Sequence, residues 1–144
     1  MAMQAVGLLT RRVVPEEERL SILPKYVGGG MWLMLLEASI FGELQSMCCS
    51  YGGGYWEMAE TSNGAFFMWP RVDGDKVDGK LDLTACNGNA KRVSPEAAGI
   101  TATLYGLNRM CWSTGKASHA ALYEALRDFA REHEEWPAIC SLTD

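Results

Sequence analysis

Residues 51–70 (YGGGYWEMAETSNGAFFMWP) constrain the fold of this chain more than any other segment. Two aromatic-rich stretches flank the pair Asn63-Gly64, and Asn-Gly between apolar runs is the strongest short-range signal for a β-hairpin. A two-residue type I′ turn would set Met58 opposite Trp69 and would give both faces of the ribbon apolar side chains. We therefore expect the hairpin to be buried on both faces, or to use one face as an interface.

Helical periodicity and turn signals organise the rest of the chain. Pro15 and the three glutamates after it predict a short helix that ends before Pro24. Ser94 and Gly115 are placed to cap the two ends of a later helix, and Pro137 is expected to stop the last one. The predicted elements are helices over residues 15–23, 31–49, 95–114 and 118–134, and further strands over 81–85 and 89–93.

This order of helices, then strands, then helices predicts an α+β fold. We expect one domain over residues 15–144, in which an antiparallel β-meander of about four strands packs with about four α-helices. Residues 1–14 show no clear period and are expected to form a flexible N-terminal arm. Residues 71–80 are polar and are expected to form a loop.

The charge of the chain excludes two classes of function. Its 18 acidic and 13 basic residues give a formal net charge of −5. A direct nucleic-acid binder usually carries a basic stripe, so no direct DNA binding is expected. A protein that imitates DNA must approach one negative charge per roughly 1.7 Å of duplex. The acidic side chains here, offset by 13 cations, cannot reach that density over a large surface.

Cysteine usage and the N-terminus indicate a cytoplasmic protein. The chain has five cysteines, an odd number without a C-x-x-C pair, which favours reduced thiols over a disulfide framework. Positive charge follows the apolar start of the chain, the reverse of a secretory signal. The most apolar segment, residues 31–41, is too short to span a bilayer.

No motif for a cofactor, a metal or a catalytic group is complete. The glycine runs depart from both phosphate-binding patterns, and the aspartates of residues 73–78 lack the other ligands of a calcium loop. His119 and His133 lie fourteen residues apart on one predicted helix, with no cysteine spacing that would complete a metal site. A nucleophilic pair of Cys111 and His119 stays open, because such partners need only meet in space.

Two sets of residues are candidates for contact with a protein, because aromatic residues and arginine are enriched at binding anchors. The alternative for the first set is a sheet core, and for the second a solvated helix end whose carboxylates oppose the helix dipole. The first set is Tyr55, Trp56, Glu57, Asn63, Trp69 and Arg71, and the second is Glu134, Glu135 and Trp136.

Five segments carry a family likeness that covers nearly the whole chain after residue 14. They are residues 19–24 (RLSILP), 51–57 (YGGGYWE), 62–68 (SNGAFFM), 94–100 (SPEAAGI) and 126–130 (LRDFA). In these segments and their spacing the chain resembles the plasmid-borne antirestriction proteins of the ArdB/KlcA type. The hairpin segments are the specific part of the likeness, since LRDFA alone would be weak.

The resemblance implies a small cytoplasmic protein that relieves type I restriction–modification of incoming DNA and so protects a plasmid or another mobile genetic element. The family is not known for enzymes, so the resemblance implies no catalytic residue and no cofactor. With DNA mimicry excluded by charge, the expected partner is the host type I complex or an associated protein. Two alternatives stay open: a plasmid maintenance or regulatory binding protein, and a Cys/His-dependent enzyme.

Overall fold

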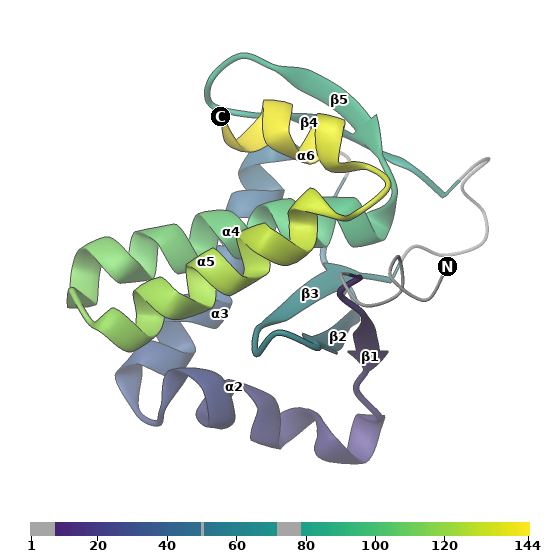
Figure 1. Cartoon of the computed structure of the whole chain (residues 1–144). Coiled ribbons are helices and arrows are strands. Elements are labelled where there is room, and N and C mark those ends of the chain that lie inside the picture. Colours follow the sequence, from purple (N-terminus) through teal and green to yellow (C-terminus); the bar gives the residue numbers. More distant parts are fainter. Residues whose placement is uncertain (1–7, 50, 72–78) are drawn as a thin grey trace.

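The computed structural model describes residues 8–49, 51–71 and 79–144, so most of the predicted loop 71–80, with its aspartates, lies outside the described residues. The α+β class is confirmed, with helices before and after the strands (Figure 1). The elements are β1 (Arg11–Val13), η1 (Glu16–Glu18), α2 (Arg19–Val27), α3 (Met31–Met47), β2 (Trp56–Thr61), β3 (Phe66–Pro70), β4 (Leu81–Thr84), β5 (Ala90–Val93), α4 (Pro95–Thr114), α5 (Ala117–Arg131) and α6 (Trp136–Thr143).

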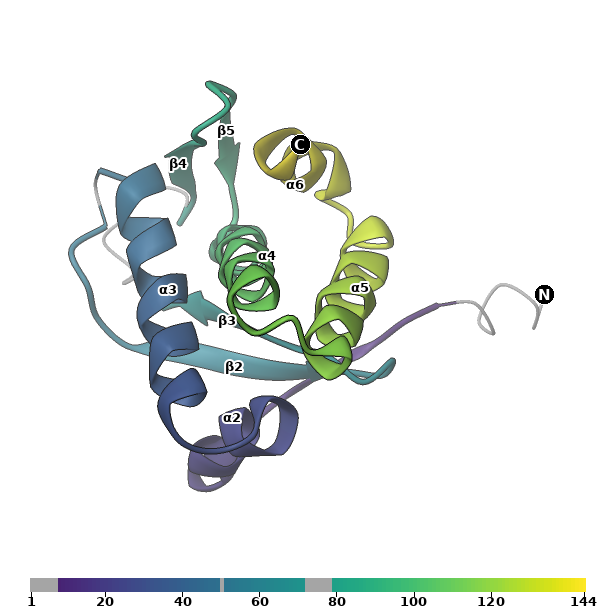
Figure 2. The same cartoon turned by 90° about the vertical axis from the view of Figure 1, so that its left-hand side faces the viewer.

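The strands form two separate antiparallel sheets, in the order β1-β2-β3 and β4-β5, instead of one continuous meander. Helix α2 lies on one side of the three-stranded sheet, and α4 and α5 lie on the other (Figures 1 and 2). Two neighbouring residues of β3 show the same division. The ring of Phe66 contacts Tyr26 of α2, whereas the ring of Phe67 stacks on Phe129 of α5. The hairpin is therefore buried on both faces, one of the two arrangements that its sequence allows.

The hairpin register predicted from a two-residue type I′ turn is wrong by one residue. Met58 pairs with Met68 and Glu57 with Trp69, because the loop holds three residues, 62–64. Among the described residues only glycines have a positive φ, and in this loop that residue is Gly64 at 91°. A three-residue loop of this kind ends on a glycine in the left-handed region. The shift exchanges which side chains of the two strands share a face.

Helix α4 covers the outer edge of β3. Ser94 accepts a hydrogen bond from the Ala97 N–H at 3.1 Å, and Gly115 ends the helix at a φ of 63°, as the sequence predicts. At the crossing with β3, the Thr103 Oγ1 accepts a hydrogen bond from the Met68 N–H at 3.2 Å. The helix thus satisfies a strand edge that would otherwise be open to solvent.

Three parts of the prediction differ most from the structure. Helix α2 continues through the exposed Pro24 to Val27, and Gly28 ends it instead. Proline has no N–H to bond the carbonyl four residues earlier, but that carbonyl belongs to an exposed turn, so the loss is tolerated. Pro137 lies in the first turn of α6, where proline is favoured, so it helps to start a helix that the sequence reading missed. The residues of β1, placed in the flexible arm, pair with β2 through residues 59–61.

Within the described residues, no single helix has the length and apolar composition needed to cross a membrane. The segments Glu16–Val27 and Met31–Met47 meet that criterion only as a pair, and the break between them bends the chain by 109°.

Candidate functional site

Five charged and aromatic side chains gather where the hairpin begins and ends. Tyr55 directly precedes β2, Glu57 lies in β2 and Arg71 directly follows β3, and the antiparallel pairing brings them to one end of the ribbon. The backbone confirms this closeness, since the Arg71 N–H donates to the Tyr55 carbonyl at 2.8 Å. Glu16 of η1 and Arg19 of α2 complete the group. We name Glu16, Arg19, Tyr55, Glu57 and Arg71 the hairpin-base cluster.

The Tyr55 ring contacts two guanidinium groups. The Cζ atoms of Arg19 and Arg71 are 4.4 and 4.5 Å from its centroid, within the range of a cation–π contact. The Tyr55 hydroxyl also accepts a hydrogen bond from Arg19 and lies 3.5 Å from a Glu16 carboxylate oxygen. Tyr55 remains 40% exposed. The result is an aromatic side chain that is fixed in position but still open to solvent.

Glu57 is the electrostatic centre of the cluster. Its carboxylate accepts hydrogen bonds from two nitrogens of Arg71, one of them Nε at 3.0 Å, and lies 3.8 Å from Arg19. The hydrogen bond with Glu57 is the main cause that raises the pKa of Arg71 further above its usual value. The two arginines face the two glutamates, so the cluster is electrically balanced and presents a planar guanidinium beside an aromatic ring.

The structure does not expose the other aromatic residues of the hairpin in the same way. Trp56 is only 5% exposed, packs on Phe41 with 4.9 Å between ring centroids, and donates its indole N–H to the Tyr51 hydroxyl at 2.7 Å. Trp56 is therefore a core residue. Trp69 is half-buried, and Asn63 donates its side-chain amide to the Ala125 carbonyl at 2.7 Å, which ties the hairpin loop to α5.

The three C-terminal candidates have different environments. Glu135 accepts hydrogen bonds from the Ser94 N–H at 2.9 Å and from the Ser94 hydroxyl, so it joins the start of α6 to the start of α4. Trp136 is half-buried with the guanidinium of Arg127 5.6 Å from its ring centroid. Glu134 is exposed to solvent. Of this set, Glu134 alone has an environment that leaves it open to a partner.

Arg11 connects this end of the molecule to the hairpin, a link that the sequence reading missed. Its guanidinium forms an ion pair with Glu96 at 2.8 Å and lies 5.9 Å from the Trp69 ring centroid. The other Glu96 oxygen is 2.9 Å from His133 Nε2, while His133 Nδ1 accepts the Glu135 N–H at 3.0 Å. His133 thus links Glu96 of α4 to the start of α6.

The environment of Glu96 makes it a contributor to acid sensitivity. Burial alone would raise the pKa of its carboxyl, but hydrogen bonds from His133 and Arg11, together with the charge of Arg11, outweigh burial and lower the pKa. A carboxyl whose pKa is lower in the folded state stabilises the fold above its unfolded pKa. That contribution is lost as the pH falls through the folded pKa.

We expect Glu96→Gln to lower the free energy of unfolding by about 1–2 kcal/mol at neutral pH, because charge-assisted hydrogen bonds become neutral ones at a largely buried side chain. The difference in free energy of unfolding between the variant and the parent should shrink as the pH falls below the ordinary range of carboxyl pKa values. Urea unfolding from about pH 7 down to about pH 2 measures this. A difference that stays constant with pH would contradict the assigned role of Glu96.

The structure does not assemble the nucleophilic pair that the sequence leaves open. His119 is buried, with Nδ1 2.8 Å from the Thr114 hydroxyl and Nε2 3.3 Å from the Val27 carbonyl. Both ring nitrogens thus face oxygen atoms and not Cys111. Burial raises the pKa of the Cys111 thiol, the opposite of what a reactive thiolate needs. Among the described residues, no group of three or more His, Cys, Asp or Glu side chains could hold a metal ion.

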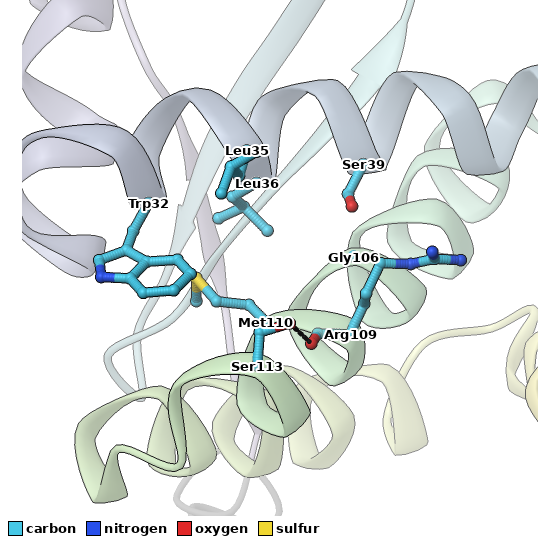
Figure 3. Close-up of a pocket in the computed structure, with 8 residues that line it drawn as sticks. All are labelled: Trp32, Leu35, Leu36, Ser39, Gly106, Arg109, Met110 and Ser113. Atoms are coloured by element: carbon cyan, nitrogen blue, oxygen red, sulfur yellow. Dashed lines mark hydrogen bonds between the residues drawn. The ribbon is translucent and has the colours of Figure 1, made fainter.

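Several large apolar side chains of α3 and α4 are exposed to solvent. Met34 of α3 and Trp112 of α4 are 70% and 85% exposed, and Met31 and Leu35 are exposed as well. A hollow of about 140 Å³ lies between these helices. Its walls, drawn in Figure 3, are Trp32, Leu35, Leu36 and Ser39 from α3 and Gly106, Arg109, Met110 and Ser113 from α4.

Comparison with solved structures defines the class of the fold. A structure of the KlcA and ArdB proteins matches this chain with a TM-score of 0.83 and 32% sequence identity, over 94% of this chain and 95% of the other. Those proteins are described as having a novel fold and antirestriction activity against type I DNA restriction systems in vivo but not in vitro. The chain thus has the fold of that group of proteins.

Sequence comparison identifies the family. Antirestriction protein KlcA of Escherichia coli is 42% identical over 139 residues, which cover 91% of this chain and 90% of KlcA. The uncharacterized protein YafX of Escherichia coli K12 is 36% identical over 94% of this chain and 88% of its own. The model of the antirestriction protein family matches residues 49–144. The chain belongs to the antirestriction protein family.

Proposed function

We propose that this protein relieves type I restriction of incoming DNA in the cytoplasm by contacting a protein, either the host restriction–modification complex or a protein associated with it. It does so without imitating DNA and without catalysing a reaction. Family membership and the structural likeness to KlcA and ArdB support the antirestriction part of this proposal. The ion pairs in the structure support the part that excludes DNA mimicry.

The observation that carries the proposal is the pairing of the carboxylates. A DNA mimic needs unpaired negative charges in an extended array that resembles phosphates. Here many of the described carboxylates are paired with cations, which disfavours an extended array of unpaired charge for a DNA-binding protein to recognise. Seven carboxylates in the described part of the chain form ion pairs with arginine, lysine or histidine, namely those of Glu18, Glu43, Glu57, Glu60, Asp82, Glu96 and Asp128.

The hairpin-base cluster is the surface that we assign to the protein contact. Tyrosine and arginine dominate binding energy at protein interfaces, and a side chain that is already ordered loses little conformational entropy on binding. Tyr55 has both properties, because Arg19 and Arg71 hold its ring while 40% of its surface stays accessible. The neighbouring residues 52–54 are exposed glycines, which add no side chains of their own beside Tyr55.

The behaviour of the related proteins favours a partner that is present in the cell. KlcA and ArdB are described as active in vivo but not in vitro. A protein that blocked the restriction enzyme directly should also act on the purified enzyme. An associated protein is therefore the favoured partner, and the type I complex itself is the other possibility. The contacts of both His119 ring nitrogens with oxygen atoms and the raised pKa of Cys111 support a mechanism without nucleophilic catalysis.

The proposal predicts the result of a plating experiment. Expression of the protein should raise the plating efficiency of unmodified phage on a host with a type I restriction system, and should change nothing on a restriction-deficient host. Arg71→Glu should reduce that rise by about tenfold or more, because it removes a guanidinium at a binding anchor and places a carboxylate beside Glu57.

Arg131→Glu is the matched control. Arg131 is also an exposed arginine in an ion pair, with Asp128 at 2.9 Å, but it lies on α5 and outside the hairpin-base cluster. Circular dichroism should show both variants folded. If the parent gives no rise, the antirestriction proposal is wrong. If the parent is active and both variants keep its activity, the assignment of the contact to the hairpin-base cluster is wrong.

A further inference from the structure

The outer edge of β1 carries backbone groups that point away from the sheet. Thr10 and Val14 hydrogen-bond toward β2 and the residue after it, since the Ser62 N–H donates to the Thr10 carbonyl at 2.7 Å and the Val14 N–H to the Met58 carbonyl at 2.9 Å. Antiparallel ladders alternate, so the N–H and C=O groups of Arg11 and Val13 face outward. Among residues 8–49, 51–71 and 79–144, no strand pairs with this edge.

The charges on this edge disfavour a second copy of the chain as its partner. In the two-fold antiparallel pairing that joins Arg11 of each copy to Val13 of the other, Arg12 of one copy would lie directly opposite Arg12 of the other. Like charges in that position are destabilising. The occupant that the edge favours is therefore an extended segment of another protein, added as a further strand by main-chain hydrogen bonds.

The residues on the α5 side of this edge indicate which side chains the added segment would carry. A hollow of about 270 Å³ lies there, with Leu9 and Phe129 as its apolar part and glutamates around them. Glu132 reaches the edge itself, because its carboxylate accepts the Leu9 N–H at 2.7 Å. Glu134 lines the same hollow and is exposed to solvent.

The balance of charge in this hollow is negative. Glu96 is neutralised by its ion pair with Arg11, while the structure shows no cation within ion-pair distance of Glu132 or Glu134 among the described residues. Both glutamates follow the C-terminal end of α5, where negative charge opposes the helix dipole. A basic side chain could extend its alkyl stem over Leu9 and Phe129 and bring its charge to these carboxylates.

We propose that the outer edge of β1 binds an extended basic segment of a partner protein by strand addition, with alternate lysine or arginine side chains directed to the hollow beside Glu132 and Glu134. Residues on one strand alternate between faces, so only every second side chain of such a segment lies on the side of the hollow. This surface is separate from the hairpin-base cluster, and the inference does not depend on the proposed antirestriction contact.

Binding of short synthetic peptides to the full-length chain tests this inference. The probe is a peptide of alternating threonine and lysine, which places all its lysines on one face of a strand. Its control has the same composition with the lysines in adjacent pairs, which divides them between both faces. We expect the alternating peptide to bind more tightly, and amide hydrogen exchange followed by NMR to show new protection at Arg11 and Val13.

Two variants separate the main-chain and side-chain parts of the contact. Val13→Pro removes an outward N–H but none of the bonds from Thr10 or Val14 to β2, and should weaken binding about tenfold, the effect of one lost hydrogen bond. Glu134→Lys should also weaken binding, whereas the control Glu124→Lys, at an exposed position of α5, should not. Glu134→Lys keeps the test valid if Val13→Pro fails to fold.

Equal affinity for the two peptides would overturn the inference, and so would unchanged exchange at Arg11 and Val13 in the presence of the alternating peptide. Binding that Glu134→Lys leaves unaltered would also overturn it. Because these measurements use the purified chain and no restriction system, their failure is distinguishable from a failure of the proposed function.

Discussion

Replacement of Gly99 by alanine is expected to destabilise this protein by about 3 kcal/mol or more, because it forces a methyl group into a contact between main chains. A Cβ atom at this position would lie 2.0 Å from the Met68 carbonyl oxygen and 2.3 Å from the Trp69 Cβ. Neither atom can move away by a change of side-chain rotamer. Helix α4 would have to separate from β3, and the hydrogen bond from Met68 to Thr103 would be lost.

Gly42→Ala is the matched control for this prediction. Gly42 also lies within a helix, α3, but a Cβ atom added there meets nothing within 4 Å. Since glycine costs a helix interior roughly 0.5–1 kcal/mol relative to alanine, this variant should be more stable than the parent by about that amount. The same substitution is thus expected to change stability in opposite directions at the two sites.

Thermal and urea unfolding of both variants measure the difference. For a chain of this size, a loss of 3 kcal/mol corresponds to a fall of roughly 6–12 °C in Tm. Hydrogen exchange at the Met68 amide should also increase in Gly99→Ala, since this amide loses its acceptor. A Gly99→Ala variant as stable as the parent would show that α4 can move off β3 without cost, contrary to the packing described above.

Features of the fold that depend on neighbouring residues could be predicted from the sequence. Ser94 and Gly115 mark the ends of α4 because a cap is a local interaction within one turn. The pairing of β1 with β2 could not be predicted in the same way, since it joins residues nearly fifty positions apart and β1 has only three residues. The shifted hairpin register has a similar cause, because Asn63 binds α5, an element that follows much later in the chain.

The same distinction between local and long-range interactions applies to the candidate site. Tyr55, Glu57 and Arg71 could be placed together because they lie at the paired ends of one hairpin. Arg19 could not, since its contact with Tyr55 depends on how α2 packs below the sheet. Exposure was harder still to predict, because neighbouring residues of a strand face opposite sides and periodicity alone does not say which side is covered. Tyr55 and Trp56 are such neighbours, and they are the most direct test of the site.

Tyr55→Ala and Trp56→Ala are expected to lose activity for different reasons. Trp56→Ala should cost about 3–5 kcal/mol in stability, because it removes a buried ring from its contacts with Phe41 and Tyr51. It should reduce antirestriction activity only through a smaller amount of folded protein. Tyr55→Ala should leave the buried core intact and still reduce the plating efficiency of unmodified phage by about tenfold or more, as expected of a binding anchor.

The comparison therefore needs activity, stability and the amount of soluble protein for each variant. At a temperature where Trp56→Ala remains folded, its activity per folded molecule should approach that of the parent, whereas that of Tyr55→Ala should stay low. If the activity of Tyr55→Ala matched the parent at equal soluble amount, the hairpin-base cluster would not be the binding surface. If folded Trp56→Ala stayed inactive, the buried indole would be needed to hold the neighbouring Tyr55 in its contacts with Arg19 and Arg71.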